Sequence, residues 1–217
     1  DEQHRFGVHQ RLALRMKCTK EGMVTHQLMM SATPIPRTLS MSYYADLDVS
    51  VLDERPPGRT DVVTKLFTDI RREEEVVRIK KACCAGKQAY WVCPLIEESE
   101  ALQLKTALDT YERLSIIFPE LKVGLLHGRL PPQEKSSVME LFKQGSIQLL
   151  VATTVIEVGV DVPNASLMVI EHAERMGLSQ LHQLRGRVGR GADASVCILL
   201  YKEPLSEIAC KRLRIIF

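Results

Sequence analysis

The sequence predicts an α/β fold in which a mostly parallel sheet is covered by helices on both faces. From about residue 60 onward, apolar strand-like segments alternate with helical segments, and this alternation is typical of parallel sheets because each crossover uses a helix. The chain has 217 residues and a hydrophobic content of 45%, which is enough to form real cores. In such folds the ligand-handling residues lie at the carboxyl ends of the strands, and we expect the polar motifs of this chain to lie there.

The first elements, in chain order, are a helix near 8–17, a strand near 25–30, a helix near 36–44 and a strand near 48–52. Proline and glycine then interrupt regular structure in the segment Arg55-Pro56-Pro57-Gly58-Arg59, which marks a linker. We therefore predict two parts, one over 1–57 and one over 58–217.

The second part contains the regular alternation. Strands are expected at 62–67, 88–93, 121–126, 147–152, 167–170 and 196–201, and helices at 70–85, 99–117, 132–144, 179–187 and from about 204 onward. In the helix over 132–144, Val138, Leu141 and Phe142 are expected to share one face, and Gly145 follows its end. Cys93 and Cys197 lie in apolar strand-like segments and are expected to be small core residues.

Bulk properties fit an intracellular protein. The formal net charge of +2 neither favours nor excludes a nucleic-acid partner, since a local basic path is sufficient for binding. The six cysteines show no paired Cys-x-x-Cys spacing, which favours a reducing cytosol over a disulfide framework or a metal site. No apolar stretch approaches membrane-spanning length and no signal peptide opens the chain, so we expect a cytoplasmic protein with no membrane partner.

The segment 180–191 carries the most information about function. It reads Gln-Leu-His-Gln-Leu-Arg-Gly-Arg-Val-Gly-Arg-Gly, with Arg185, Arg187 and Arg190 at close spacing and a glycine after each arginine or next to it. Arginine is always charged and presents a planar fork of donors that matches phosphate oxygens. Glycine allows close approach of the backbone to a ligand or a sharp turn. The pattern predicts a phosphate-binding segment, and the alternative is a solvated basic loop.

Two segments near the start of the chain offer carboxylates and hydroxyls. Asp1-Glu2-Gln3-His4 supplies a carboxylate pair, of the kind that can hold Mg²⁺ through its water shell and orient an attacking water, although a terminal acidic pair can also be only solvated. The triplet Ser31-Ala32-Thr33 follows an apolar segment and precedes Pro34-Ile35-Pro36-Arg37-Thr38. Its hydroxyls can bond both to a carboxylate and to the backbone, and would link a hydrolytic site to a nucleic-acid path.

Two further constellations follow predicted strands. His127-Gly128 closes the strand over 121–126, where the histidine is either a ligand contact or a hydrogen-bonded strand-end residue. In the segment 150–163, Thr153 and Thr154 follow an apolar strand and precede Glu157, Gly159 and Asp161. Hydroxyls and free backbone N–H groups at a helix start suit a sugar-phosphate backbone. The alternatives are helix capping by the threonines and a simple turn at Asp161.

These segments resemble motifs II, III, V and VI of the superfamily-2 helicases, in the order of that family. The longer strings at 1–8, 32–38, 88–100 and 151–165 narrow the resemblance to bacterial RecG-like ATP-dependent DNA helicases, over essentially the whole chain. The resemblance implies a RecA-like parallel sheet flanked by helices, the helicase C-terminal domain, over 58–217. It also implies that 1–57 is a remnant of a first RecA-like domain.

The resemblance implies ATP and Mg²⁺ as cofactors. It makes Glu2, Arg187 and Arg190 catalytic, with Glu2 orienting water and the arginines reaching across a domain cleft to the γ-phosphate. The other implied roles are nucleotide binding by Asp1 (which also holds Mg²⁺ through water), Gly159, Asp161 and Gln183; coupling by His4, Ser31 and Thr33; and DNA binding by Arg37, His127, Gly128, Thr153 and Thr154.

The implied activity is ATP-driven translocation on double-stranded DNA, which remodels stalled replication forks and Holliday junctions by branch migration in recombination and repair. The implied partners are branched DNA and the single-stranded-DNA-binding protein, and the implied location is the bacterial nucleoid. The chain contains no G-x-x-x-x-G-K-[ST] phosphate loop. We therefore expect a fragment of a longer enzyme that also lacks the family's wedge domain and is inactive alone.

Three alternatives remain open. A transcription-repair coupling factor shares the strings of motifs II and III, although 44–48 and 88–91 favour a RecG-like enzyme. The isolated fragment can also act as a non-catalytic module that binds nucleotide or nucleic acid. An RNA helicase is the third alternative, but it is expected to carry DEAD or DEAH strings in place of the segment 1–8.

Overall fold

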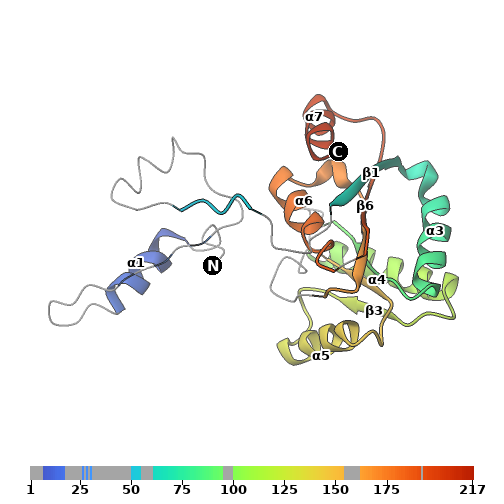
Figure 1. Cartoon of the computed structure of the whole chain (residues 1–217), viewed down its shortest axis with the longest axis horizontal. Helices are drawn as coiled ribbons and strands as arrows, with labels where there is room; N and C mark the ends of the chain where they lie inside the picture. Colours follow the sequence, from blue (N-terminus) through green and yellow to red (C-terminus); the bar gives the residue numbers. More distant parts are fainter. Residues whose placement is uncertain are drawn as a thin grey trace. The chain divides into compact units, whose positions relative to one another are not determined.

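The computed structural model describes residues 7–17, 26, 28, 30, 50–54, 61–94, 100–153, 162–191 and 193–217 (Figure 1). The chain divides into two compact units, Asp1–Asp53 and Glu54–Phe217. Among the described residues, no helix is long and apolar enough to cross a membrane.

The described part of the first unit contains helix α1 (Val8–Lys17), which confirms the helix predicted over 8–17. The strand predictions for this unit are wrong at the residues that can be checked: His26, Leu28, Met30 and residues 50–52 are not in strands. A strand is defined by its ladder of hydrogen bonds to a neighbour, and the described strands all pair with one another in the second unit. The helix predicted over 36–44 lies outside the described residues.

The second unit is built on a sheet of six parallel strands in the order β1-β6-β5-β2-β4-β3 (Figure 1). The strands are β1 (Val62–Thr68), β2 (Gln88–Val92), β3 (Val123–Leu126), β4 (Leu149–Ala152), β5 (Ala165–Ile170) and β6 (Ser195–Tyr201). The α-helices are α3 (Arg72–Cys84), α4 (Glu100–Ile117), α5 (Pro132–Lys143), α6 (Leu178–Arg185) and α7 (Glu207–Ile216). Two short 3-10 helices, η2 (Asp69–Arg71) and η4 (Ala173–Arg175), complete the described elements of this unit. The predicted α/β class and all six predicted strands are confirmed.

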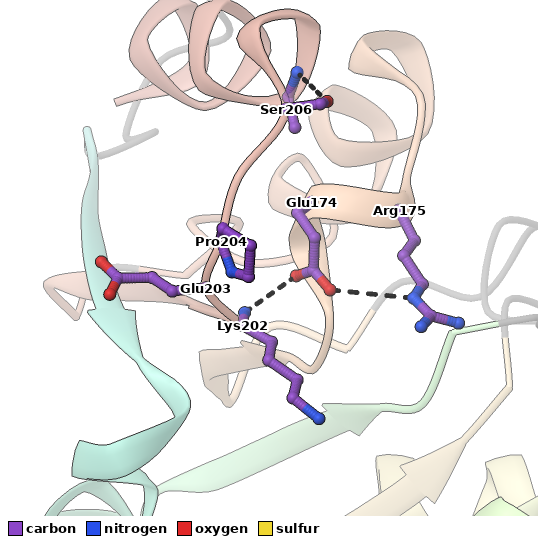
Figure 2. Close-up of a pocket in the computed structure, with 7 residues that line it drawn as sticks. Glu174, Arg175, Lys202, Glu203, Pro204 and Ser206 are labelled. Carbon is purple, nitrogen blue, oxygen red and sulfur yellow. Dashed lines mark hydrogen bonds and ion pairs between the residues drawn. The ribbon is translucent and has the colours of Figure 1, made fainter.

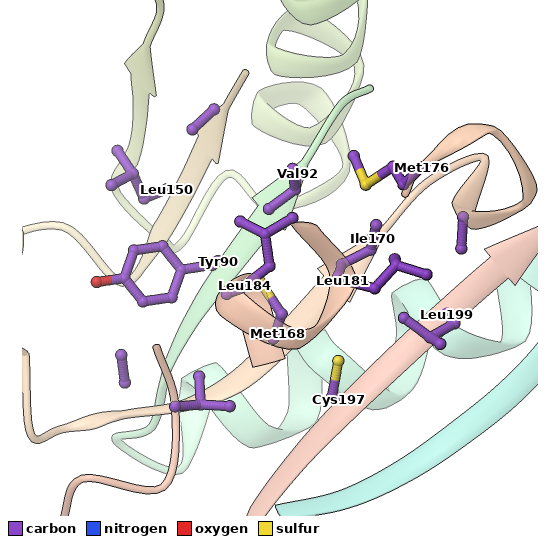
Figure 3. Close-up of a cluster of buried hydrophobic side chains, with 14 of the residues drawn as sticks. Tyr90, Val92, Leu150, Met168, Ile170, Met176, Leu181, Leu184, Cys197 and Leu199 are labelled. Carbon is purple, nitrogen blue, oxygen red and sulfur yellow. The ribbon is translucent and has the colours of Figure 1, made fainter. Parts of the chain in front are cut away.

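Helices cover both faces of the sheet, because each central strand is apolar on both sides. In β2, Tyr90 and Val92 point to a core that also contains residues of α5, α6 and α7, whereas Ala89 and Trp91 point to a second core with residues of α3 and α4. Figure 3 shows part of the first core, where Leu181 and Leu184 of α6 approach the strands. Cys93 and Cys197 are fully buried, as predicted, and burial raises the pKa of each thiol to about 12.

Helices α3 and α5 are each followed by a glycine in a left-handed backbone conformation. Gly86 (φ +92°) and Gly145 (φ +77°) occupy the left-handed region just after these helices, where glycine carries no Cβ penalty. After α5, the amide of Gly145 donates to the carbonyl of Phe142 and that of Ser146 to Leu141, which satisfies carbonyls at the helix end.

The expectation for the buried face of α5 is partly wrong. Phe142 is fully buried and Val138 packs against the core, but the side chain of Leu141 is exposed. Val138 and Phe142 are four residues apart and lie on one stripe of the helix, whereas Leu141 is turned by about 100° from Phe142. A helix of this length on the sheet surface buries a narrow stripe, and Leu141 falls outside it.

Candidate functional site

The arginine segment 185–191 lies at the opposite edge of the sheet from the one predicted. Strand β5 ends at the carboxyl edge, and α6 then carries the chain back across the face of the sheet. The backbone of Gly191 packs against Pro163, which directly precedes β5, and β6 begins only at Ser195. The prediction that all motifs lie at carboxyl strand ends is therefore wrong for this segment, because a crossover helix returns the chain to the amino edge before the next parallel strand begins.

Two glycines shape the arginine segment. Gly189 adopts φ +78°, a conformation that L residues rarely adopt. A Cβ on Gly191 would lie 2.4 Å from the carbonyl oxygen of Pro163, far inside contact distance. The segment is therefore anchored by close packing of its own backbone against the start of β5. This anchoring defines where the arginine side chains begin.

The three arginines have different surroundings. The Nη1 of Arg185 donates to the carbonyl of Ile216 in α7 at 3.2 Å, so this side chain ties two helices together. Arg190 is exposed, and its Nε donates to the carbonyl of Gly186 at 3.2 Å. Arg187 and Gln183 are half-buried. Arg185 thus links α6 to α7, and Arg187 and Arg190 are the two arginines for which a ligand contact is predicted.

A second group of candidates does lie at the carboxyl edge. His127 follows β3 and Thr153 follows the adjacent strand β4, and the amide of Thr153 donates to the carbonyl of Leu126 at 3.1 Å. Thr153 is 3% exposed, and no described residue makes a hydrogen bond to its hydroxyl. A buried hydroxyl normally has a partner, so this group is suited to contact a ligand at the edge of the sheet.

The surroundings of His127 are positively charged. Burial, followed by the charges of Lys135 and Arg129, lowers the pKa of His127 below its ordinary value. Gly128 is exposed, and its carbonyl accepts a hydrogen bond from the Nζ of Lys135 at 2.6 Å. Sequence reasoning selected His127 and Gly128 but missed Arg129 and Lys135. The arginine directly after Gly128 was the available signal. The position of Lys135 in the first turn of α5 is visible only in the fold.

The carboxyl edge also carries a buried ion pair that sequence reasoning missed. The guanidinium of Arg72, at the start of α3, contacts the carboxylate of Glu171 after β5, with Nη2 to Oε1 at 2.7 Å and Nε to Oε1 at 2.8 Å. It also lies 5.1 Å from the centre of the Trp91 ring, a cation–π contact. Both charged side chains are only about a tenth exposed. No local pattern signalled this pair, since its members are 99 residues apart.

Nine of the predicted site residues lie outside the described residues, and their roles remain predictions. They are Asp1, Glu2, His4, Ser31, Thr33, Arg37, Thr154, Gly159 and Asp161.

The fold is that of a helicase C-terminal domain, and residues 75–192 match the family model of the helicase conserved C-terminal domain. The chain belongs to this family. It is 64% identical over all 217 residues to the ATP-dependent DNA helicase RecG of Escherichia coli, of which it covers 31%. The RecG resemblance predicted from the motifs is thereby confirmed, and the chain spans about a third of the length of this relative.

Solved structures agree with this assignment. A structure of RecG bound to a three-way DNA junction matches the whole chain with a TM-score of 0.77 and 46% identity, and the chain covers 27% of that protein. Dbp5 of Saccharomyces cerevisiae, bound to RNA and ADP BeF3, matches 86% of the chain with a TM-score of 0.60; the match covers 46% of Dbp5. Its identity of 20% shows a common fold alone. The predicted fold of a helicase C-terminal domain is confirmed.

Proposed function

We propose that this chain is part of an ATP-dependent translocase on double-stranded DNA, which remodels stalled replication forks and Holliday junctions by branch migration. The arginine segment carries the proposal: its backbone is anchored against Pro163, and Arg190 is exposed next to that anchor. Such an arrangement holds a guanidinium ready for a phosphate on another domain. Relatives with 64% identity are ATP-dependent DNA helicases, which supports the same activity here.

The chemistry of the arginine segment fits the triphosphate of ATP. Arg190 and Arg187 would stabilise charge on the transferring phosphoryl group, a contribution that reaches about 10³-fold or more in other nucleotide hydrolases. Gln183, in the last turn of α6, would contact the nucleotide. Asp1 and Glu2, with Gly159 and Asp161, would complete the site, Asp1 by holding Mg²⁺ through water and Glu2 by orienting the attacking water. Mg²⁺ would supply charge neutralisation between the phosphates.

The carboxyl edge fits the sugar-phosphate backbone of DNA. The hydroxyl of Thr153 and the exposed backbone of Gly128 lie on neighbouring strand ends, beside His127, Arg129 and Lys135. Contacts of this kind carry no sequence information and weaken with salt. Thr154 and Arg37 are assigned to the same path, and His4, Ser31 and Thr33 to coupling between the path and the hydrolytic site.

Hydrolysis and DNA grip would then be connected by closure and opening of a cleft between two RecA-like domains. In this proposal residues 58–217 form the second domain and 1–57 belong to the first. Branched DNA is the proposed partner, since the similar RecG structure is bound to a three-way junction. The single-stranded-DNA-binding protein is a further proposed partner, and the cytoplasm, at the bacterial nucleoid, is the proposed location.

The test places this chain in a complete enzyme. The 217 residues would replace the corresponding segment of E. coli RecG, and ATP hydrolysis with forked DNA would be compared for the chimera and its Arg190→Ala variant. We expect a loss of at least about 10³-fold in turnover with nucleotide binding largely kept, because the arginine acts mainly on the transition state. Arg113→Ala, at an exposed arginine of α4 paired with Glu73, is the control and should retain turnover. Turnover that survives Arg190→Ala would contradict the proposed role of the arginine segment.

A further inference from the structure

The turn between β5 and α6 contains an unusual backbone conformation. His172 directly follows Glu171 at the end of β5 and has φ +48° and ψ +45°, in the left-handed region. It is the one non-glycine residue with a positive φ in the part of the chain that the structure describes. A histidine persists in this conformation only when its surroundings hold it there, and such positions gather at functional sites.

The side chain of Glu174 contacts His172, and Arg212 of α7 fixes the backbone of the same turn by donating to the carbonyls of Glu174 and Met176 at 2.8 and 2.6 Å. The Oε1 of Glu174 lies 3.4 Å from the Nδ1 of His172 and 3.8 Å from the Nε of Arg175, and its Oε2 accepts a hydrogen bond from the backbone amide of Lys202 at 3.3 Å. Figure 2 shows the carboxylate of Glu174 between Lys202 and Arg175. The side chain of Glu174 is only 13% exposed, whereas those of His172 and Arg175 are 31% and 53% exposed. One carboxylate therefore joins the end of β5, η4 and the residue after β6.

This turn sets the course of the helix that leads to the arginine segment. The amide of Arg175 donates to the carbonyl of His172 at 2.9 Å, which closes η4, and Gly177 then begins α6. Eight helical residues later the chain reaches Arg185 and the segment 185–191. The backbone of His172 therefore leads, through η4 and Gly177, into the helix that ends at the arginine segment.

The charged groups around His172 favour its protonated form. Glu174 makes the largest contribution and raises the pKa of His172, Glu171 at the end of β5 adds to this effect, and burial and Arg175 oppose it. Burial of Glu174 acts against its ionisation, but the contacts with His172 and with backbone amides outweigh it and lower the pKa of Glu174. The contacts between the two side chains therefore favour a protonated His172 beside an ionised Glu174.

We propose that His172 is a positioning residue, whose protonated imidazole, held by Glu174, fixes the turn that aims the arginine segment. The conformation of the segment then follows the protonation state of His172. The consequence for ATP hydrolysis rests on the proposed function. The coupling between the protonation of His172 and the conformation of the arginine segment is independent of that function.

The direction of the pH effect follows from linkage. A histidine whose pKa is higher in the folded than in the unfolded chain stabilises the fold fully below the unfolded pKa, near 6.5. That contribution is lost as the pH rises through the folded pKa. The turn should therefore be held below the unfolded pKa of histidine and loosen as the pH rises through the raised, folded pKa of His172.

NMR titration of the whole 217-residue chain tests the coupling. The ring signal of His172 and the backbone amides of Arg187, Gly189 and Arg190 would be followed from about pH 5 to 9. We expect the amides to titrate with the midpoint of His172, above the ordinary value for histidine. Glu174→Gln should shift this midpoint downward. In His172→Asn the amide titration should disappear with the fold kept, because asparagine tolerates the left-handed region and does not titrate.

A control separates His172 from the other histidine close to the segment. His182, on α6, has its Nδ1 3.4 Å from the Nη2 of Arg185, and the amide titration should survive His182→Gln. Amides that do not move with His172, or a His172 midpoint that is unchanged in Glu174→Gln, would overturn the proposal. In the chimera, the ratio of ATP turnover at about pH 6.5 to that at about pH 8.5 should approach unity with His172→Asn. If the amides titrate as expected but Arg190→Ala leaves turnover intact, the proposed function fails and the positioning role stands.

Discussion

Gly191 offers a direct test of how the arginine segment is anchored. In Gly191→Ala the new Cβ would lie 2.4 Å from the carbonyl oxygen and 3.3 Å from the carbonyl carbon of Pro163, so backbone on one side or the other must move. Overpacking of this kind costs about 1–3 kcal/mol, and the upper part of that range is expected because a backbone carbonyl cannot rotate away as a side chain can. For a chain of this size, such a loss lowers the Tm by roughly 4–10 °C.

Thermal unfolding followed by circular dichroism measures this loss, and Gly86→Ala is the matched control. Gly86 has φ +92°, and no atom lies within 4 Å of the position that a Cβ would occupy there, so its replacement tests left-handed backbone without a clash. Gly191 has no such φ, so its replacement tests the clash without left-handed backbone. Both variants should be destabilised, the control by about 1–2 kcal/mol. Only Gly191→Ala should also shift the amide signals of Arg187 and Arg190.

The result that would refute this reasoning is a Gly191→Ala variant with the parental Tm and unmoved arginine amides. It would mean that Pro163 yields without cost and that the glycine does not anchor the segment.

Two other predictions concern buried groups. Glu171→Gln should lower the free energy of unfolding by about 3 kcal/mol, at the low end for a broken buried pair, because Arg72 keeps a weaker 3.5 Å contact with the exposed carboxylate of Glu73. Replacing both Arg72 and Glu171 by apolar residues should recover much of the loss, and equal urea midpoints for all three proteins would contradict this. Cys93 and Cys197, with pKa values of about 12, should resist iodoacetamide at about pH 8 in the native chain and react only after unfolding, whereas exposed Cys84 should react at once; mass spectrometry of labelled peptides distinguishes the outcomes.

The six strands of the second unit were predictable because buried parallel strands are continuous apolar runs between helices. Their order was not predictable, since β1 and β6 lie at opposite ends of this part of the sequence and pair side by side. The secondary-structure and burial predictions that failed did so because the outcome depends on which distant residues pack against the segment. Residues 50–52 are apolar enough for a strand but have no place in the described sheet, and Leu141 is apolar but lies beside the buried stripe of α5.

The candidate site was likewise predictable in part. Arginines and glycines at 185–191 indicated phosphate chemistry, because few other residue types provide a fork of donors on a closely packed backbone. Sequence reasoning placed this segment at the wrong edge of the sheet, although it had assigned catalytic roles to Arg187 and Arg190 and none to Arg185. Only the fold shows that Arg185 is engaged by α7 and that Gly191 meets Pro163.

The sequence by itself determined the class of fold, the family and the residue types available for phosphate and DNA, because these depend on local pattern and on motif order. The tertiary structure alone decided which of those residues lie together and which already form contacts inside the fold. It also decided which residues without any sequence motif support them. The Arg72–Glu171 pair and the contact of Glu174 with the amide of Lys202 carry no local signal, because each joins groups that follow separate strands. Coulombic contacts depend on distance in space, and the linear sequence does not contain that distance.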